Sequence, residues 1–183
     1  MTIEGREAAA ALSDIEDIVR RVRQSRIYQL ASLLLIMWGA LVFAGYLVTW
    51  LSPRYAFYAW PAVYVVGIAG SVVISVSNRM RSGVRTFDAR MLAAFVSFIA
   101  FGIFSSWLGH FGPRQLSTFW PIYFMLIYTI AGLWVGYAFV AIGLSIIVLT
   151  LVGYFFIGDA FDLWMAFVNG GGLMLGGLWM RRS

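Results

Sequence analysis

Long uncharged apolar segments alternate with short arginine-bearing segments from residue 27 to the end of the chain. A helix that crosses the hydrocarbon core of a membrane needs about 20 mostly apolar residues. The stretch 119–157 has no charged residue and is nearly twice as long as one span requires, so we divide it near Gly136, where glycine can end a helix. A re-entrant pair within that stretch is the alternative. The pattern predicts six transmembrane helices, at about residues 27–51, 56–76, 91–109, 119–135, 138–157 and 163–180.

Arginine placement predicts an orientation for these six helices. Cationic residues gather on the cytoplasmic side of membrane proteins. Arg54 and Arg114 fall on one side of the predicted membrane, and all the other arginines fall on the opposite side. We therefore expect both termini in the cytoplasm and the protein in a bacterial inner membrane. The arginines on the cytoplasmic side are Arg6, Arg20, Arg21, Arg23, Arg26, Arg79, Arg81, Arg85, Arg90, Arg181 and Arg182.

Composition supports a lipid environment and excludes several classes of function. The chain of 183 residues is 62% hydrophobic and 11% charged, whereas soluble domains are about 45–50% apolar and about 25% charged. Cysteine is absent, which excludes disulfides, thiolate metal sites and cysteine nucleophiles. The net charge of +5 does not indicate nucleic-acid binding, because the arginines flank apolar segments. Membrane lipids are the expected surroundings.

Tryptophan positions agree with this arrangement. Indole rings favour the two membrane–water interfaces, and all but one of the tryptophans map to the ends of predicted helices. Trp38 alone maps to the middle of a span. The outer helix ends carry Trp50, Trp60, Trp107, Trp120 and Trp164, and the inner ends carry Trp134 and Trp179.

A nine-residue pattern occurs twice, as PRYAFYAWP at 53–61 and as PRQLSTFWP at 113–121. We interpret both copies as outer loops in which Pro61 and Pro121 begin the following helix, because proline suits the first helical turn. A third outer loop, GDAFDLWM, keeps a tryptophan, Trp164, but has no proline. The pattern predicts three tandem helical hairpins; two loops that merely meet the same physical demand are the alternative.

Five charged or titratable residues form a candidate cluster on the outer face. Two arginine-bearing loops and one aspartate-bearing loop favour ion pairs that would tie the hairpins together, or a charged vestibule for a solute. The single histidine is either an interfacial loop residue or part of a pH-sensing or metal site. The members are Arg54, His110, Arg114, Asp159 and Asp162.

The predicted spans contain no Asp, Glu, Lys or Arg in their interiors. Ion-coupled transporters usually bury an ionisable group in the membrane, so this class is disfavoured. Asn169 is the only amide in the interior of a predicted span. Two GxxxG pairs predict close helix packing, within the chain or with a second copy, and an unwound segment at a substrate site is a further alternative. The helix-packing candidates are Gly132, Gly136, Gly172 and Gly176.

Residues 1–26 are predicted to form a cytoplasmic amphipathic helix ahead of the transmembrane domain, residues 27–183. Ser13 and Glu16 have the spacing of a capping box, which favours a helix start at Ser13. The helix either lies on the inner leaflet or docks a partner or a second copy. Apolar residues recur at spacings of three and four, and the candidate docking face is Leu12, Ile15, Val19 and Val22.

No catalytic motif and no metal- or cofactor-binding pattern is present, so we expect neither enzymatic activity nor a cofactor. The segment DIEDIVRRVRQSR before an aromatic first span, the WP-containing helices and the closing GGLWMRR resemble small uncharacterised six-helix inner-membrane proteins of bacteria. That resemblance implies a topology and no activity. The leading hypothesis is a non-enzymatic accessory or signalling protein that engages a partner through its N-terminal helix. The alternatives are a small channel or facilitator for an uncharged or weakly polar solute, and a binder of a lipid, quinone or pigment.

Overall fold

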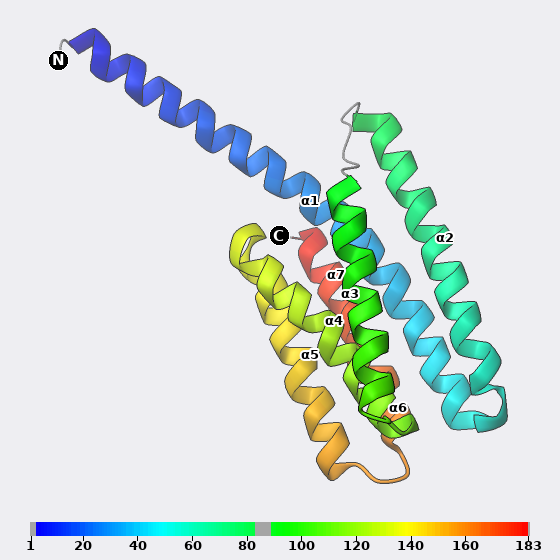
Figure 1. Cartoon of the computed structure of the whole chain (residues 1–183). Coiled ribbons are helices and arrows are strands. Elements are labelled where there is room, and N and C mark those ends of the chain that lie inside the picture. The colour runs from blue at the N-terminus through cyan, green and yellow to red at the C-terminus, as the bar shows by residue number, and fades with distance from the viewer. Residues whose placement is uncertain (1–2, 83–88, 183) are drawn as a thin grey trace.

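The computed structural model describes residues 3–82 and 89–182, with the side chains at most positions before residue 27 and at several beside residues 83–88 left undescribed. The described ranges are helical, with short connections and no strand. Figure 1 shows the helices as a bundle from which the first helix projects. The elements are α1 (Ile3–Leu51), the 3₁₀ turn η1 (Pro53–Tyr55), α2 (Ala56–Ser82), α3 (Ala89–Leu108), α4 (Pro113–Val135), α5 (Tyr137–Phe156), α6 (Phe161–Met165), the π-helix η2 (Ala166–Gly171) and α7 (Gly172–Arg182).

Several helices are long and apolar enough to cross a membrane, so the prediction of an all-helical, multi-pass membrane protein is confirmed. Five segments of the described chain meet that length and composition. The third predicted span is represented by a shorter apolar segment, Leu92–Leu108, within α3. The five are Ile27–Leu51, Pro53–Asn78, Pro113–Val135, Tyr137–Phe156 and Phe161–Arg182.

The uncharged stretch 119–157 is divided into two helices at Gly136, as the sequence predicted. Gly136 separates α4 from α5 and has a φ of 153°, a region that side chains with a Cβ rarely adopt. Its N–H donates to the carbonyl of Gly132 at 3.0 Å, which closes the end of α4. A Cβ on Gly132 would lie 2.6 Å from the backbone nitrogen of Val140. The two glycines therefore allow a one-residue connection between antiparallel helices that are each 20 residues long or more.

The repeated nine-residue pattern is not a loop, and that interpretation was wrong. α4 begins at Pro113 and α2 at Ala56, so Pro121 and Pro61 lie inside helices. The first proline of each copy occupies the helix start instead: Pro113 begins α4, and Pro53 begins the 3₁₀ turn ahead of α2. A proline at that position loses no helical hydrogen bond, because its missing N–H would be unpaired there anyway.

The interior proline of α4 is accommodated by a tyrosine of α1. Proline has no N–H, so Pro121 leaves the carbonyl four residues earlier, that of Ser117, without its helical donor. The hydroxyl of Tyr46 donates to the Ser117 carbonyl at 2.8 Å, and the Tyr46 side chain is buried. The broken helical bond thereby becomes a link between α1 and α4.

This link gives a measurable expectation. Tyr46→Phe should destabilise the protein by about 1–2 kcal/mol, because a carbonyl within the bundle loses its donor. Pro121→Ala restores the helical N–H, so Tyr46→Phe should cost much less in that background. A double-mutant cycle of unfolding in detergent measures the difference. Equal costs in the two backgrounds would contradict the compensation.

The three expected hairpins share a packing feature. In each, a tryptophan near the start of the second helix lies over a glycine of the first helix, where a Cβ would stand close to the indole ring. A glycine at that point lets the ring approach the partner helix. The same contact thus recurs in the three expected hairpins, although the most extensive helix contacts are between α4 and α5 and between α1 and α7. The pairs are Trp60 with Gly45, Trp120 with Gly102, and Trp164 with Gly153.

The apolar core joins α1, α4, α5 and α7, while α2 and α3 are peripheral. Buried Leu35, Met125, Ile142 and Leu173 belong to one core cluster. α2 lies against α1, and α3 lies against α4 (Figure 1). The mid-span Trp38 belongs to the α1–α2 contact: its indole N–H donates to the Ser71 hydroxyl at 3.0 Å.

No helix end lies between the N-terminal arm, residues 3–26, and the first predicted span. α1 continues from Ile3 to Leu51 as one helix of 49 residues. The predicted start at Ser13 is therefore wrong, because the chain is already helical for ten residues before it. In Figure 1 the arm extends beyond the bundle at the end where α7 also terminates.

Candidate functional site

Arg114, in the first turn of α4, is the best-anchored member of the predicted outer-face cluster. Its guanidinium donates to the carbonyls of Tyr154 at 2.9 Å and of Gly153 and Gly158 at 3.4 Å, and also to that of Ile157. The end of α5 leaves carbonyls without helical donors and carries partial negative charge. Arg114 therefore caps α5 from a neighbouring helix, a structural role that spacing did not reveal.

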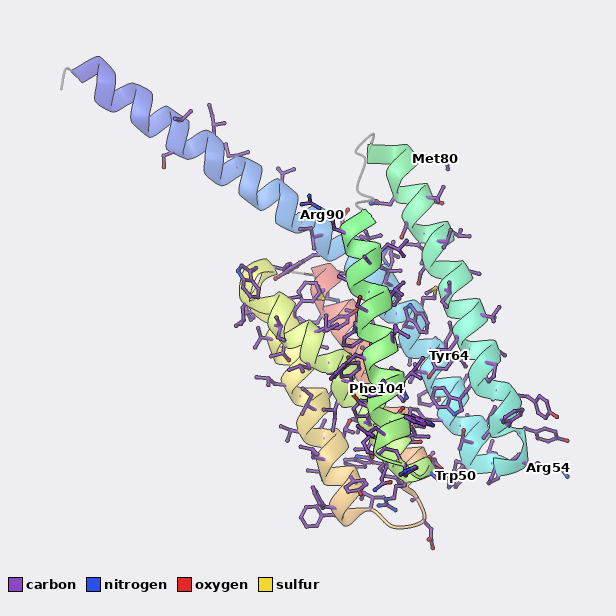
Figure 2. The ribbon with its side chains drawn as sticks, viewed as in Figure 1. Trp50, Arg54, Tyr64, Met80, Arg90 and Phe104 are labelled. Atoms are coloured by element: carbon purple, nitrogen blue, oxygen red, sulfur yellow. The ribbon has the colours of Figure 1, made fainter. Side chains whose placement is uncertain are left out.

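The five predicted residues do not form one cluster, although Asp162 lies within electrostatic reach of Arg114. Arg54 stacks over the ring of its neighbour Tyr55 at 4.7 Å, at the α1–α2 hairpin that Figure 2 shows well apart from α6. Asp159 is exposed, and Asp162, half-buried in α6, experiences the charge of Arg114. The Arg114 guanidinium donates to backbone carbonyls, so at this arginine helix capping takes the place of the expected ion pair.

His110 has a backbone role at the end of α3. Its φ is 48°, in the left-handed region. The N–H of Phe111 donates to the carbonyl of Ser106 and that of His110 to Trp107, both at 3.1 Å. These are the two hydrogen bonds of a Schellman cap, with histidine where glycine is usual. The imidazole is exposed, which agrees with an interfacial loop residue.

The GxxxG pair formed by Gly172 and Gly176 faces α5. A Cβ on Gly176 would stand 2.8 Å from Ile142, and one on Gly172 would stand 3.3 Å from Ile146. These glycines thus serve packing within the chain, one of the roles the spacing allowed. Gly132 and Gly136 serve the α4–α5 turn described above.

The closest helix approach involves glycines that the GxxxG pattern did not identify. A Cβ on Gly170 would lie 2.5 Å from the Cα of Phe43, and one on Gly39 would lie 2.7 Å from the carbonyl oxygen of Gly170. Further along, a Cβ on Gly177 would lie 2.9 Å from the carbonyl oxygen of Ser32. α1 and the final helix are therefore in backbone contact. The run of glycines at 170–172 indicated a close helix contact, but the sequence did not indicate that α1 would be the partner helix.

Asn169 forms a buried polar pair with Thr150 of α5. Its Nδ2 lies 3.4 Å from the Thr150 hydroxyl and 3.5 Å from the sulfur of Met165. Asn169 lies in the π-helix η2, and π-helical turns often occur at functional positions. Both polar side chains are buried, so the pair contributes to packing specificity between α5 and the last helix.

The proposed docking face of the arm is uncovered in this structure. Leu12, Ile15 and Val22 are each at least half exposed, and Ile18 adds a fourth exposed apolar side chain beside them. The side chain of Val19 lies outside the described residues. This apolar stripe lies on a helix that projects from the bundle, so packing within the chain does not explain it.

Comparison with known proteins assigns no family: no family model, curated protein or solved structure matches the chain.

Proposed function

We propose that the protein is a non-enzymatic accessory or signalling protein of the bacterial inner membrane that binds a protein partner through the arm of α1. The observation that carries this proposal is the exposed apolar stripe on a helix that projects from the bundle. Exposed Leu, Ile and Val side chains in water favour burial against another surface. The distribution of arginines supports six spans with both termini, and hence the arm, in the cytoplasm.

Two features favour protein docking over the other expected roles of the arm. α1 is unbroken at residues 26–27, so the arm continues the direction of the first span rather than turning onto the membrane surface. Several hydroxyl groups within the spans bond carbonyls of their own helices, as Ser71 does with Gly67 and Thr129 with Met125. These groups are occupied in packing, which favours an accessory protein over a facilitator with a polar path.

The experiment is native mass spectrometry of the protein extracted from its own membrane with its lipids. Leu12→Glu combined with Ile15→Glu should abolish any assembly larger than the monomer, because charges in the stripe oppose its burial. Ser13→Glu, at an exposed position on the opposite side of the arm, is the matched control and should leave the assembly intact. An assembly that survives the double substitution would refute docking through the arm.

A further inference from the structure

The outward side of the contact between α1 and α7 changes from apolar to cationic toward the arm. On α7, exposed Leu175, Leu178 and Arg182 recur at spacings of three and four residues, so they share one face of the helix. On α1, exposed Gln29 and Leu33 are likewise four residues apart. Each helix therefore presents leucine first and a polar side chain one turn nearer the arm. We call these five residues the α1–α7 seam.

The register of the two helices brings the polar ends of the seam together. A Cβ on Gly39 would meet the carbonyl oxygen of Gly170, and one on Gly177 would meet that of Ser32. Later residues of the last helix thus meet earlier residues of α1, and the two helices run antiparallel. About one further turn places the end of α7 beside Gln29. In Figure 1, α7 ends next to α1 where the arm leaves the bundle.

Small residues leave room along the apolar part of the seam. A Cβ added to Gly171 would meet nothing within 4 Å, and Ala40, which the register places at the same level, is exposed. Beyond them, the rings of Phe43 and Phe167 meet edge to face at 5.3 Å. From Gly171 to Arg182 the helix rises about 16 Å, which is about half the hydrocarbon thickness of a bilayer. The seam therefore has the length of one lipid leaflet.

The arginines at the end of the seam have no acidic partner. Arg181 and Arg182 are exposed, and within the described residues neither guanidinium has an ion pair or a side-chain hydrogen bond. The acidic residues of the chain lie in the arm before residue 18, just ahead of α3, or around α6 at the opposite end of the bundle. The sequence adds Arg26, three residues before Gln29, although its side chain lies outside the described residues. This end of the seam therefore favours an anion.

An aromatic pair marks the depth at which the seam changes character. Trp179 lies between Leu178 and Arg182 in the sequence of α7, and indole rings favour the membrane–water interface. Its ring meets that of Tyr137, at the start of α5, edge to face at 5.8 Å. The leucines of the seam thus lie at the depth of acyl chains and the arginines at the depth of headgroups.

We propose that the α1–α7 seam binds an anionic phospholipid of the leaflet on the side of the arm. An acyl chain lies along Leu33, Leu175 and Leu178. The phosphate accepts charge-assisted hydrogen bonds from the guanidinium groups of Arg181 and Arg182. A zwitterionic phospholipid fits less well, because its ammonium group would bring a like charge to the arginines. This site goes beyond the proposed function and does not depend on what the arm binds.

Native mass spectrometry of the full chain, delipidated in detergent and titrated with phosphatidylglycerol or phosphatidylcholine, tests the site. The wild-type protein should bind the first phosphatidylglycerol about 20-fold more tightly, since each arginine beside an anionic lipid contributes roughly fivefold. Arg181→Gln combined with Arg182→Gln should reduce this preference to about twofold or less. Gln29→Glu should also lower it, because a carboxylate there pairs with the arginines and repels the phosphate.

Arg90→Gln is the matched control, because it removes an exposed arginine at the same end of the bundle from the peripheral helix α3 (Figure 2). It should leave the preference for phosphatidylglycerol unchanged. An equal loss in this variant would indicate a general effect of surface charge and refute the site. A wild-type protein without the preference, or a preference that survives the double substitution, would refute it too.

Two further outcomes overturn defined parts of the inference. A preference that is lost on the double substitution but unchanged by Gln29→Glu would refute the place of α1 beside the headgroup. Displacement of phosphatidylglycerol by inorganic phosphate would show that the arginines bind a free anion, and would refute the contribution of the acyl chain. Retention of the lipid in excess phosphate is the expected result, because the leucines of the seam hold a chain that phosphate lacks.

Discussion

Gly170→Ala is expected to destabilise the protein by about 3 kcal/mol, at the upper end of the range for overpacked cores. The added Cβ would lie 2.5 Å from the Cα and Cβ of Phe43 and 2.6 Å from its nitrogen, so α1 itself must move. Backbone cannot rotate away as the tip of a flexible side chain can. Thermal or denaturant unfolding in detergent micelles measures the loss.

The neighbouring glycine provides a matched control for this prediction. Gly171 lies in the same π-helix, but a Cβ there meets nothing within 4 Å. Gly171→Ala should therefore change stability by no more than about 0.5 kcal/mol. Similar losses from the two substitutions would show that the π-helix, rather than the contact with α1, is sensitive to alanine.

Arg114→Ala should destabilise the protein by about 2 kcal/mol. Hydrogen bonds from a charged donor contribute about 1.5–3 kcal/mol, and partial exposure of the guanidinium keeps the total toward the lower end. Its removal leaves the carbonyls at the end of α5 without this cap. Arg114→Lys keeps the charge but loses the forked donor geometry, so its loss should be intermediate. The measurement is unfolding of each variant in detergent.

Arg54 is the natural control, because it holds the equivalent place in the other copy of the nine-residue pattern. Among the described residues it stacks over the exposed ring of Tyr55 alone, and Arg54→Ala should change stability by less than about 0.5 kcal/mol. Equal losses at Arg54 and Arg114 would mean that the general charge of this end of the bundle, rather than the cap on α5, is what matters.

The contrast between these arginines shows how far the sequence predicts the candidate site. Proline, arginine and tryptophan recur 60 residues apart, and the spacing placed both arginines in outer loops that join the two helices of a hairpin. It did not distinguish them, because only Arg114 comes beside the end of a third helix. A local pattern contains no information about which distant carbonyls a side chain will reach.

The division at Gly136 and the position of Pro121 make a second contrast. Gly136 ends a helix through its own backbone freedom, which is local and therefore readable in the sequence. Pro121 was expected at a helix start for an equally local reason, yet it lies inside α4. Tyr46, 75 residues away, supplies a donor for the carbonyl that Pro121 leaves free. That compensation exists only when α1 packs against α4.

The sequence by itself determined that the chain is helical and built for lipid, because apolar segments about 20 residues long can satisfy their backbone groups in a membrane only as helices. It also determined the division of the longest segment at Gly136. Tertiary structure decided which glycines lie at backbone contacts, which arginine caps a helix and which face of α1 stays uncovered. In a membrane protein, residues facing lipid and residues facing protein are equally apolar, so the faces become distinct only when the helices are packed.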